Sequence, residues 1–272
     1  TDNDQQIEAR ALRLLAAKQV DGILLAPVIP GPSLVAADLS SRGLPMVLLD
    51  RRTGGLEAAP LVSLDHVATA RLATHHLITL GHTRIAILTE VPELALLQPG
   101  SQGRIDRPAT QRLRGYLSAL EEAGIDFDPR LVIGTAYHQS AAEAAVRASL
   151  LGSRATALFA TNSVVTSGAF RALAALGVNI PRELSFIGFD DQEWTTMVTP
   201  PVSVVAQPPQ ELGVAAADAL MRRIENPEAP IADAILPGDL LLRASTSAPG
   251  DTTPAVQGPP AVQPSSNPEE DR

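Results

Sequence analysis

The sequence contains no cysteine, few aromatic residues and no long apolar run, and each absence excludes a class of protein. Without cysteine there is neither a disulfide framework nor a thiolate metal site. Aromatic residues make up 3% of the chain, so alanine, leucine, valine and isoleucine must build the core. No stretch reaches the ~20 apolar residues of a membrane-spanning helix, and the acidic, polar start is unlike a signal peptide. We therefore expect a soluble, cytoplasmic protein.

Basic residues are also in deficit, which argues against direct nucleic-acid binding by this chain. Lysine and arginine number 21 against 30 acidic residues, giving a net charge of −9 and a pI near 5.0. Such a chain is a poor nucleic-acid binder by itself. Its 272 residues, 45% of them hydrophobic, suffice for two core-bearing units.

The most informative stretch is the apolar run 184–189, which lies between Pro181 and the acids Asp190 and Asp191. A short apolar run with such boundaries is typical of a buried parallel strand. Ligands of open α/β sheets bind outside the carboxyl ends of the strands. The two acids are thus candidates for a binding site, although acids at this position also serve as turn or helix-capping residues.

The rest of the chain alternates strands with helices and predicts an α/β fold with mainly parallel sheets. The alternation runs to a strand at 84–89 and restarts after a long loop at 90–106, which favours two similar lobes. Predicted strands are 20–27, 45–50, 61–64, 84–89, 131–133, 156–160, 184–189, 202–207 and 236–243. Predicted helices are 4–18, 33–41, 67–80, 108–123, 139–150, 163–176 and 208–224.

The C-terminal segment 248–272 differs from the rest in composition. It holds six prolines, many small polar residues and no aromatic residue. Because such a segment cannot bury enough apolar surface to fold, we predict a disordered tail.

Four stretches of the chain, taken together and in order, resemble the lactose-repressor-type (LacI/GalR) bacterial transcription regulators. They are VDGILLAP at 20–27, ATHHLITLGHTRIA at 73–86, RLRGY at 112–116 and SFIGFDD at 185–191. The resemblance extends to about residue 247. It implies two Rossmann-like lobes of the periplasmic-binding-protein type I architecture, joined by crossing strands, with a small effector held between them.

The resemblance also implies a division of the chain and an incomplete first lobe. Residues 1–82 and 207–228 would form the first lobe, and residues 83–206 and 229–247 the second. The family's helix-turn-helix headpiece, its hinge helix and the first elements of the first lobe have no counterpart here. The strand near Ile23 would then lack its natural neighbour.

Six residues match positions that hold the effector in the resembled family. They are Asp190, Arg112, Asn162, Tyr137, Asp65 and Gln207. Asp190 would accept hydrogen bonds from effector hydroxyls, Arg112 would supply a guanidinium fork and Tyr137 an aromatic platform. Asn162 matches an Ala-Asn-Asp turn, but Ser163 replaces the usual acid.

Several of these assignments have a structural alternative that the sequence leaves open. Arg112 could be a helix-surface charge, Asn162 the N-cap of the following helix, and Tyr137 a packing residue. Asp65 follows a short strand, and Gln207 lies at a predicted crossing. We find no metal spacing around the adjacent histidines at 75 and 76 or His82, and we expect neither metal nor cofactor.

The function implied by the resemblance is sensing of a small effector, a sugar or sugar derivative, by a DNA-binding regulator. Operator DNA would be reached only through the headpiece, and the intact parent would be a homodimer. A free-standing periplasmic-type sugar-binding protein for transport is the alternative, to be distinguished by the sequence upstream of Thr1. An enzyme is not expected, since no nucleophile or acid–base pair can be identified, and no membrane partner is expected.

Overall fold

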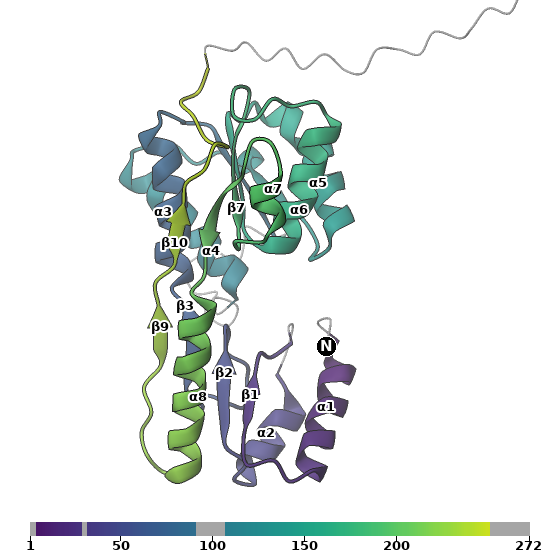
Figure 1. The fold of residues 1–272 in the computed structure, drawn as a ribbon, viewed down its shortest axis with the longest axis vertical. Helices are drawn as coiled ribbons and strands as arrows, with labels where there is room; N and C mark the ends of the chain where they lie inside the picture. Colours follow the sequence, from purple (N-terminus) through teal and green to yellow (C-terminus); the bar gives the residue numbers. More distant parts are fainter. Residues whose placement is uncertain (1–3, 29–31, 91–106, 251–272) are drawn as a thin grey trace, which may run out of the picture.

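Two separate sheets organise the chain, one in each of two α/β lobes (Figure 1). The computed structural model describes residues 4–28, 32–90 and 107–250. The first sheet has the order β1-β2-β3-β9 and is parallel throughout. Its strands are β1 (Ile23–Leu25), β2 (Met46–Leu49), β3 (Leu61–Leu64) and β9 (Ala234–Leu236). Within the described residues β1 is therefore an edge strand, as expected for an incomplete first lobe.

The second sheet has the order β10-β8-β7-β6-β4-β5 and is parallel except for the β10–β8 pair. Its strands are β4 (Ile85–Thr89), β5 (Val132–Gly134), β6 (Ala157–Ala160), β7 (Ser185–Phe189), β8 (Ser203–Ala206) and β10 (Asp239–Leu241). The parallel α/β architecture predicted from the strand–helix alternation is confirmed.

Helices cover both faces of each sheet (Figure 1). The helices are α1 (Gln5–Ala17), α2 (Leu34–Ser41), α3 (His66–Thr79), α4 (Pro108–Glu122), α5 (Gln139–Ser153), α6 (Ser163–Ala175), α7 (Trp194–Met197) and α8 (Pro209–Glu225), with a 3-10 turn, η3 (Pro129–Leu131). None of the helices in the described ranges has both the length and the apolar character that a bilayer crossing requires.

Alternation along the strands decides which helices pack on which face. In β2, Met46 and Leu48 pack in a core with α1 and α2, whereas Val47 points to the opposite face and packs against α8. In β4, Ile85 and Ile87 pack in the core shared with α3 and α4. The intervening residues of β4 pack with α5 and α6 on the other face. Each lobe thus has two apolar layers around one sheet.

Two elements lie in a different lobe from the one that the sequence-based division gives them. Helix α3 packs through Ala70, Ala73 and Leu77 into the core of the second sheet, not the first. Strand β9 pairs with β3 in the first sheet, although that division places residues 229–247 in the second lobe. The predicted single extended piece at 236–243 instead contains the last residue of β9 and the whole of β10, which belong to different sheets. These strands are separated at Pro237-Gly238, which local sequence pattern does not distinguish from a simple bend.

The predicted disordered tail lies almost wholly outside the described residues, which end at Gly250. Up to that point the C-terminal segment is anchored on the second lobe. The Ser247 backbone N–H donates to the Ser185 hydroxyl at 3.0 Å, and the Ser247 carbonyl lies 2.9 Å from the imidazole Nε2 of His82. Removal of the tail therefore has to leave Ser247 in place.

Candidate functional site

Arg112, in the first turns of α4, is the most deeply buried charge near the carboxyl ends of the second sheet. Its side chain is only 5% exposed. The guanidinium lies 3.8 Å above the ring centroid of Phe189, and one nitrogen donates to the Thr161 carbonyl at 2.5 Å. Nε has no acceptor within the described part of the chain. The guanidinium is thus buried, lies over an aromatic ring and keeps one donor without a partner in the described residues. A buried donor of this kind favours binding of an acceptor.

Three carboxylates raise the pKa of Arg112 and so act against the effect of burial, and each of them directly follows a strand. Burial lowers the pKa of Arg112, while Asp50, Asp190 and Glu90 act in the opposite direction. Asp190 and Glu90 lie at the ends of β7 and β4 in the second sheet, but Asp50 lies at the end of β2 in the first. Carboxylates from both lobes therefore raise the pKa of the same guanidinium.

Asp50 and Asp190 share an uncommon backbone conformation. Their φ angles are +67° and +68°, in the left-handed region that aspartate tolerates better than most residues. Each amide is held by the neighbouring strand: Asp50 N–H donates to the Val62 carbonyl at 2.9 Å and Asp190 N–H to the Val205 carbonyl at 2.7 Å. Such strain persists where surrounding structure fixes it, often at binding sites.

The two carboxylates differ in their side-chain partners. Gln207 donates through Nε2 to Asp190 Oδ1 at 2.6 Å. Asp50 accepts from the Arg51 guanidinium at 2.7 Å and lies 3.1 Å from His66 Nε2. Burial alone would raise the pKa of Asp50, but the His66 hydrogen bond and the positive charges of Arg51 and Arg112 outweigh it and hold this pKa well below its usual range.

Asn162 caps α6, the alternative that the sequence left open, and also contacts Glu90. Its Oδ1 accepts from the Val165 amide at 2.9 Å, which makes it the N-cap of α6. Its Nδ2 donates to the carboxyl group of Glu90. Burial raises the pKa of Glu90, with the charge of Arg112 acting in the opposite sense. The capping residue of α6 thereby also fixes the acid at the end of β4.

Tyr137 lies close to the same charges from the loop between β5 and α5. Its side chain is 49% exposed. Burial of the remainder, together with the negative charges of Glu90 and Asp190, raises the pKa of the phenol. We call the grouped side chains the interlobe cluster. It consists of Asp50, Arg51, Glu90, Arg112, Tyr137, Asn162, Asp190 and Gln207.

Comparisons with known proteins agree with this architecture. A model of the periplasmic binding protein-like domain matches residues 74–246. The ribose operon repressor of Haemophilus influenzae is 32% identical over 248 residues, which are 90% of this chain and 70% of that protein. The chain belongs to the LacI/GalR family of transcription regulators.

Solved LacI-type structures are similar over most of this chain. A LacI family regulator from Enterococcus faecium with bound ribose has a TM-score of 0.73 at 29% identity, covering 87% of this chain and 84% of that one. A CelR–cellobiose complex has a TM-score of 0.75 at 29% identity, covering 88% and 70%. This chain is thus the effector-binding part of a LacI-type regulator, and these similarities favour the regulator over the transport protein.

Asp65, the sixth residue predicted for the effector site of this LacI-type chain, lies outside the interlobe cluster. Its carboxylate accepts from the Ala68 amide at 2.9 Å and caps α3. It lines a separate groove of about 550 Å³ together with Arg71, His75 and Glu122. Asp65 therefore has a capping contact, which its position after a short strand did not by itself indicate.

Asp191, the second acid after β7, also points away from the cluster. It forms an ion pair with Arg243 at 2.6 Å. The same guanidinium donates to the Thr195 hydroxyl at 3.0 Å and to the Val202 carbonyl at 2.8 Å. Asp191 therefore fastens the segment after β10 onto the second lobe.

Sequence reasoning missed five residues around Arg112: Asp50, Arg51, His66, Glu90 and Phe189. Asp50 and Glu90 carried a usable signal, since each directly follows a predicted strand as Asp190 does. The roles of Phe189 and His66 had no such signal. They depend on how α4 crosses the end of β7 and on where α3 begins relative to β2.

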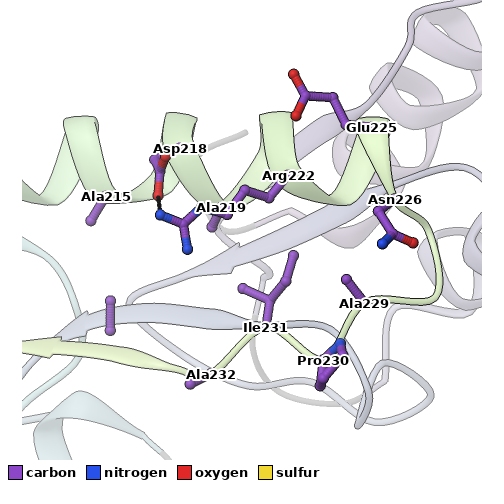
Figure 2. Close-up of a pocket in the computed structure, with 11 residues that line it drawn as sticks. Ala215, Asp218, Ala219, Arg222, Glu225, Asn226, Ala229, Pro230, Ile231 and Ala232 are labelled. Carbon is purple, nitrogen blue, oxygen red and sulfur yellow. Dashed lines mark ion pairs between the residues drawn. The ribbon is translucent and has the colours of Figure 1, made fainter.

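A second cavity, of about 600 Å³, lies between α8 and residues 229–234 (Figure 2). Its walls are largely apolar, formed by alanines and Ile231, and its rim carries the exposed ion pair of Asp218 with Arg222 at 2.9 Å. It contains no buried charge comparable to Arg112. Over the ranges that the structure describes, no group of histidine and acidic side chains is arranged to hold a metal ion.

Proposed function

We propose that the interlobe cluster binds a small, uncharged sugar or related polyol and that this binding is the regulatory signal. The observation that carries the proposal is the buried guanidinium of Arg112, which lies over the Phe189 ring at the end of β7. Burial lowers its pKa, and the charges of Asp50 from the first lobe and Asp190 from the second act to raise it. The similarity to a ribose-bound regulator and to a cellobiose complex supports a sugar.

The chemistry of the cluster suits a neutral ligand with many hydroxyl groups. Carboxylates accept hydrogen bonds from hydroxyls, and Arg112 and Asn162 donate to hydroxyl or ring oxygens. Tyr137 offers an exposed aromatic face for the apolar side of a sugar ring. Because acids and guanidinium groups are present in similar number, the cluster has no large excess of positive charge for an anionic ligand.

The proposal gives each lobe a share of the ligand. The first lobe contributes Asp50 and Arg51, and the second contributes Arg112, Asn162 and Asp190. Gln207 follows β8 at a crossing and orients Asp190. A ligand that contacts both lobes can favour one lobe arrangement over another, which is the requirement for an effector.

The wider regulatory setting follows from family membership and is part of the proposal. The chain acts by binding rather than catalysis, in the cytoplasm, as part of a homodimer whose headpieces contact operator DNA. The first lobe comprises residues 4–28, 32–64 and 207–236, and the second residues 66–90, 107–206 and 239–247. This division adjusts the sequence-based boundaries to the pairing of β9 and the packing of α3.

Calorimetric titration with ribose, cellobiose and a panel of other neutral sugars tests the proposal. Asp190→Asn keeps the shape and removes the charge, so folding should survive while affinity for the bound sugar falls about 10- to 100-fold. Asp65→Asn is a matched control, because asparagine caps a helix as well as aspartate does. Unchanged affinity in Asp190→Asn, or a loss confined to Asp65→Asn, would place the site elsewhere.

A further inference from the structure

His66 is a completely buried histidine with one engaged and one unengaged ring nitrogen. Nε2 lies 3.1 Å from Asp50 Oδ1 and 3.3 Å from the Ser63 hydroxyl. Nδ1 has no hydrogen-bond partner in the described residues. The side chain is 0% exposed. The engaged nitrogen of His66 therefore faces the carboxylate of Asp50, a member of the interlobe cluster.

The surroundings of His66 decide its protonation. Burial lowers the pKa of His66 and the positive charge of Arg112 acts in the same direction, with Asp50 opposing both. A second proton would lie on Nδ1, where no acceptor is available in the described residues. We therefore assign a neutral imidazole with its proton on Nε2. The Ser63 hydroxyl can donate to the Asp50 carbonyl at 3.0 Å, which leaves the histidine N–H for the carboxylate.

The contact between His66 and Asp50 joins elements of different lobes. His66 is the first residue of α3, whose buried face packs in the second lobe. Asp50 follows β2, in the middle of the first sheet. Figure 1 shows α3 beside the upper sheet and β2 in the lower one. A shift of α3 relative to the first sheet would have to change this hydrogen bond.

The Asp50 carboxylate is fixed by donors on both oxygens. Oδ1 faces His66, while Oδ2 accepts from the Arg51 guanidinium. Arg51 belongs to the same loop as Asp50 and can move with it. His66 also follows β3 of the first sheet closely, but it begins α3, which packs in the second lobe. Of these two donors, only His66 belongs to an element of the second lobe. Only its hydrogen bond therefore makes the orientation of the carboxylate depend on where the second lobe lies.

We propose that His66 is a positioning residue that orients Asp50 for the effector and links this orientation to the arrangement of the lobes. The inference rests on the proposed function for the nature of the effector. The contact between His66 and Asp50 does not depend on that function. The same hydrogen bond that holds Asp50 is the one that an altered lobe arrangement would lengthen or break. His66 thereby makes effector affinity depend on lobe position without contacting the effector.

Two substitutions separate this role from a general packing role. His66→Phe keeps a buried ring but removes the donor. His66→Gln places an amide N–H near the position of Nε2 and should restore the hydrogen bond. His82→Phe is the matched control, since His82 is similarly buried but contacts Ser185 at the opposite end of β7.

The first readout needs no ligand. The carboxyl carbon of Asp50, followed by NMR as pH is lowered, should titrate at a higher pH in His66→Phe than in the wild type, while His66→Gln and His82→Phe should resemble the wild type. An unchanged Asp50 titration in His66→Phe would overturn the inference, whether or not a sugar binds.

The second readout is affinity for ribose, or for whichever panel sugar the wild type binds. His66→Phe should weaken binding about tenfold, as expected for loss of a hydrogen bond to a charged group. His66→Gln should stay within about threefold of the wild type on the same scale. Equal losses in the Phe and Gln variants would reduce His66 to a packing residue. Absence of any sugar binding by the wild type would refute the proposed function alone, and the titration would still decide the role of His66.

Discussion

The two lobes present the same kind of residue at their facing edges but hold it differently. Asp50 and Asp190 both follow a central strand, and both have a left-handed φ, of +67° and +68°. Asp190 receives a neutral amide donor, Gln207, whereas Asp50 receives the charged Arg51 and a histidine from the other lobe. The left-handed backbone conformation is thus common to both aspartates. Their side-chain partners differ, and only the orientation of the Asp50 carboxylate depends on a side chain from the other lobe.

The strongest test of this comparison removes Arg112, the guanidinium whose pKa burial lowers and the charges of both aspartates raise. In Arg112→Met the carboxylates of Asp50, Asp190 and Glu90 would face one another without this counter-charge. Loss of the charged hydrogen bond from Arg112 to the Thr161 carbonyl typically costs about 1.5–3 kcal/mol. We expect sugar binding to disappear and the free energy of unfolding in urea to fall by that order. Retained binding would mean that the lobes do not share Arg112.

A second test compares the two aspartates directly. Asp50→Asn and Asp190→Asn should each lower sugar affinity by about one to two decades, because each removes a charge-assisted acceptor. The two losses should be additive only if the lobes act independently. Calorimetry on both single variants and the double variant measures this. A loss in Asp190→Asn alone would confine the site to the second lobe.

A third test separates binding from the stability of the second lobe. The side chain of Arg243 is 17% exposed and holds Asp191, Thr195 and the Val202 carbonyl. Arg243→Ala should lower the free energy of unfolding by about 2–4 kcal/mol, since its partners lose their donor. Affinity for the sugar should not change, because Asp191 points away from the cluster. A loss of affinity without a loss of stability would contradict that geometry.

A fourth test uses pH, because burial lowers the pKa of both His66 and His82. The unfolded chain takes up these protons below a pKa of about 6.5, whereas the native state resists them. The contribution of the two neutral imidazoles to the free energy of unfolding is therefore complete above about pH 6.5. It is lost as the pH falls towards the lower native pKa values of the two histidines.

Urea unfolding of the wild type between about pH 8 and pH 5, a range that spans the ordinary histidine pKa, measures this loss. His82→Gln and His66→Gln should each flatten the decline, because glutamine does not titrate in this range. An undiminished slope in both variants would trace the acid sensitivity to other groups.

The smallest effect is expected at the C-terminus. Deleting residues 251–272 should leave both the unfolding free energy and the sugar affinity within experimental error, because the segment is rich in proline and polar residues and lacks aromatic residues. Extending the deletion to Ser247 should lower stability, since His82 and Ser185 would lose their partner. Thermal denaturation of the two truncations distinguishes these cases.

Local sequence pattern predicts the strands and helices well because alternation and terminating residues are short-range signals. The same signals mark Asp190, whose strand ends abruptly in acids, and they are equally present at Asp50. They cannot assign α3 or β9 to a lobe, because membership depends on which apolar face meets which sheet after the chain has crossed. The position of Asp65 illustrates the same limit: an acid after a strand can face a ligand or cap the next helix.

Side-chain roles that arise from packing between distant segments are not predictable in this way. His66 is one residue from Asp65 in sequence, and the parallel pairing of β2 with β3 is what brings it to Asp50. The sequence places Phe189 in a buried strand, and its ring is indeed buried. Its second function, as the surface beneath Arg112, requires α4 to begin above the end of β7.

Along the described parts of the chain, the backbone passes from one lobe to the other at three places: between β3 and α3, between β8 and α8, and between β9 and β10. Three covalent links keep the facing edges at a high effective concentration relative to each other. A single hydrogen bond between free partners in water would rarely be formed. Between tethered lobes, forming the contact of His66 with Asp50 costs little additional entropy, so its occupancy reports small changes in their relative position.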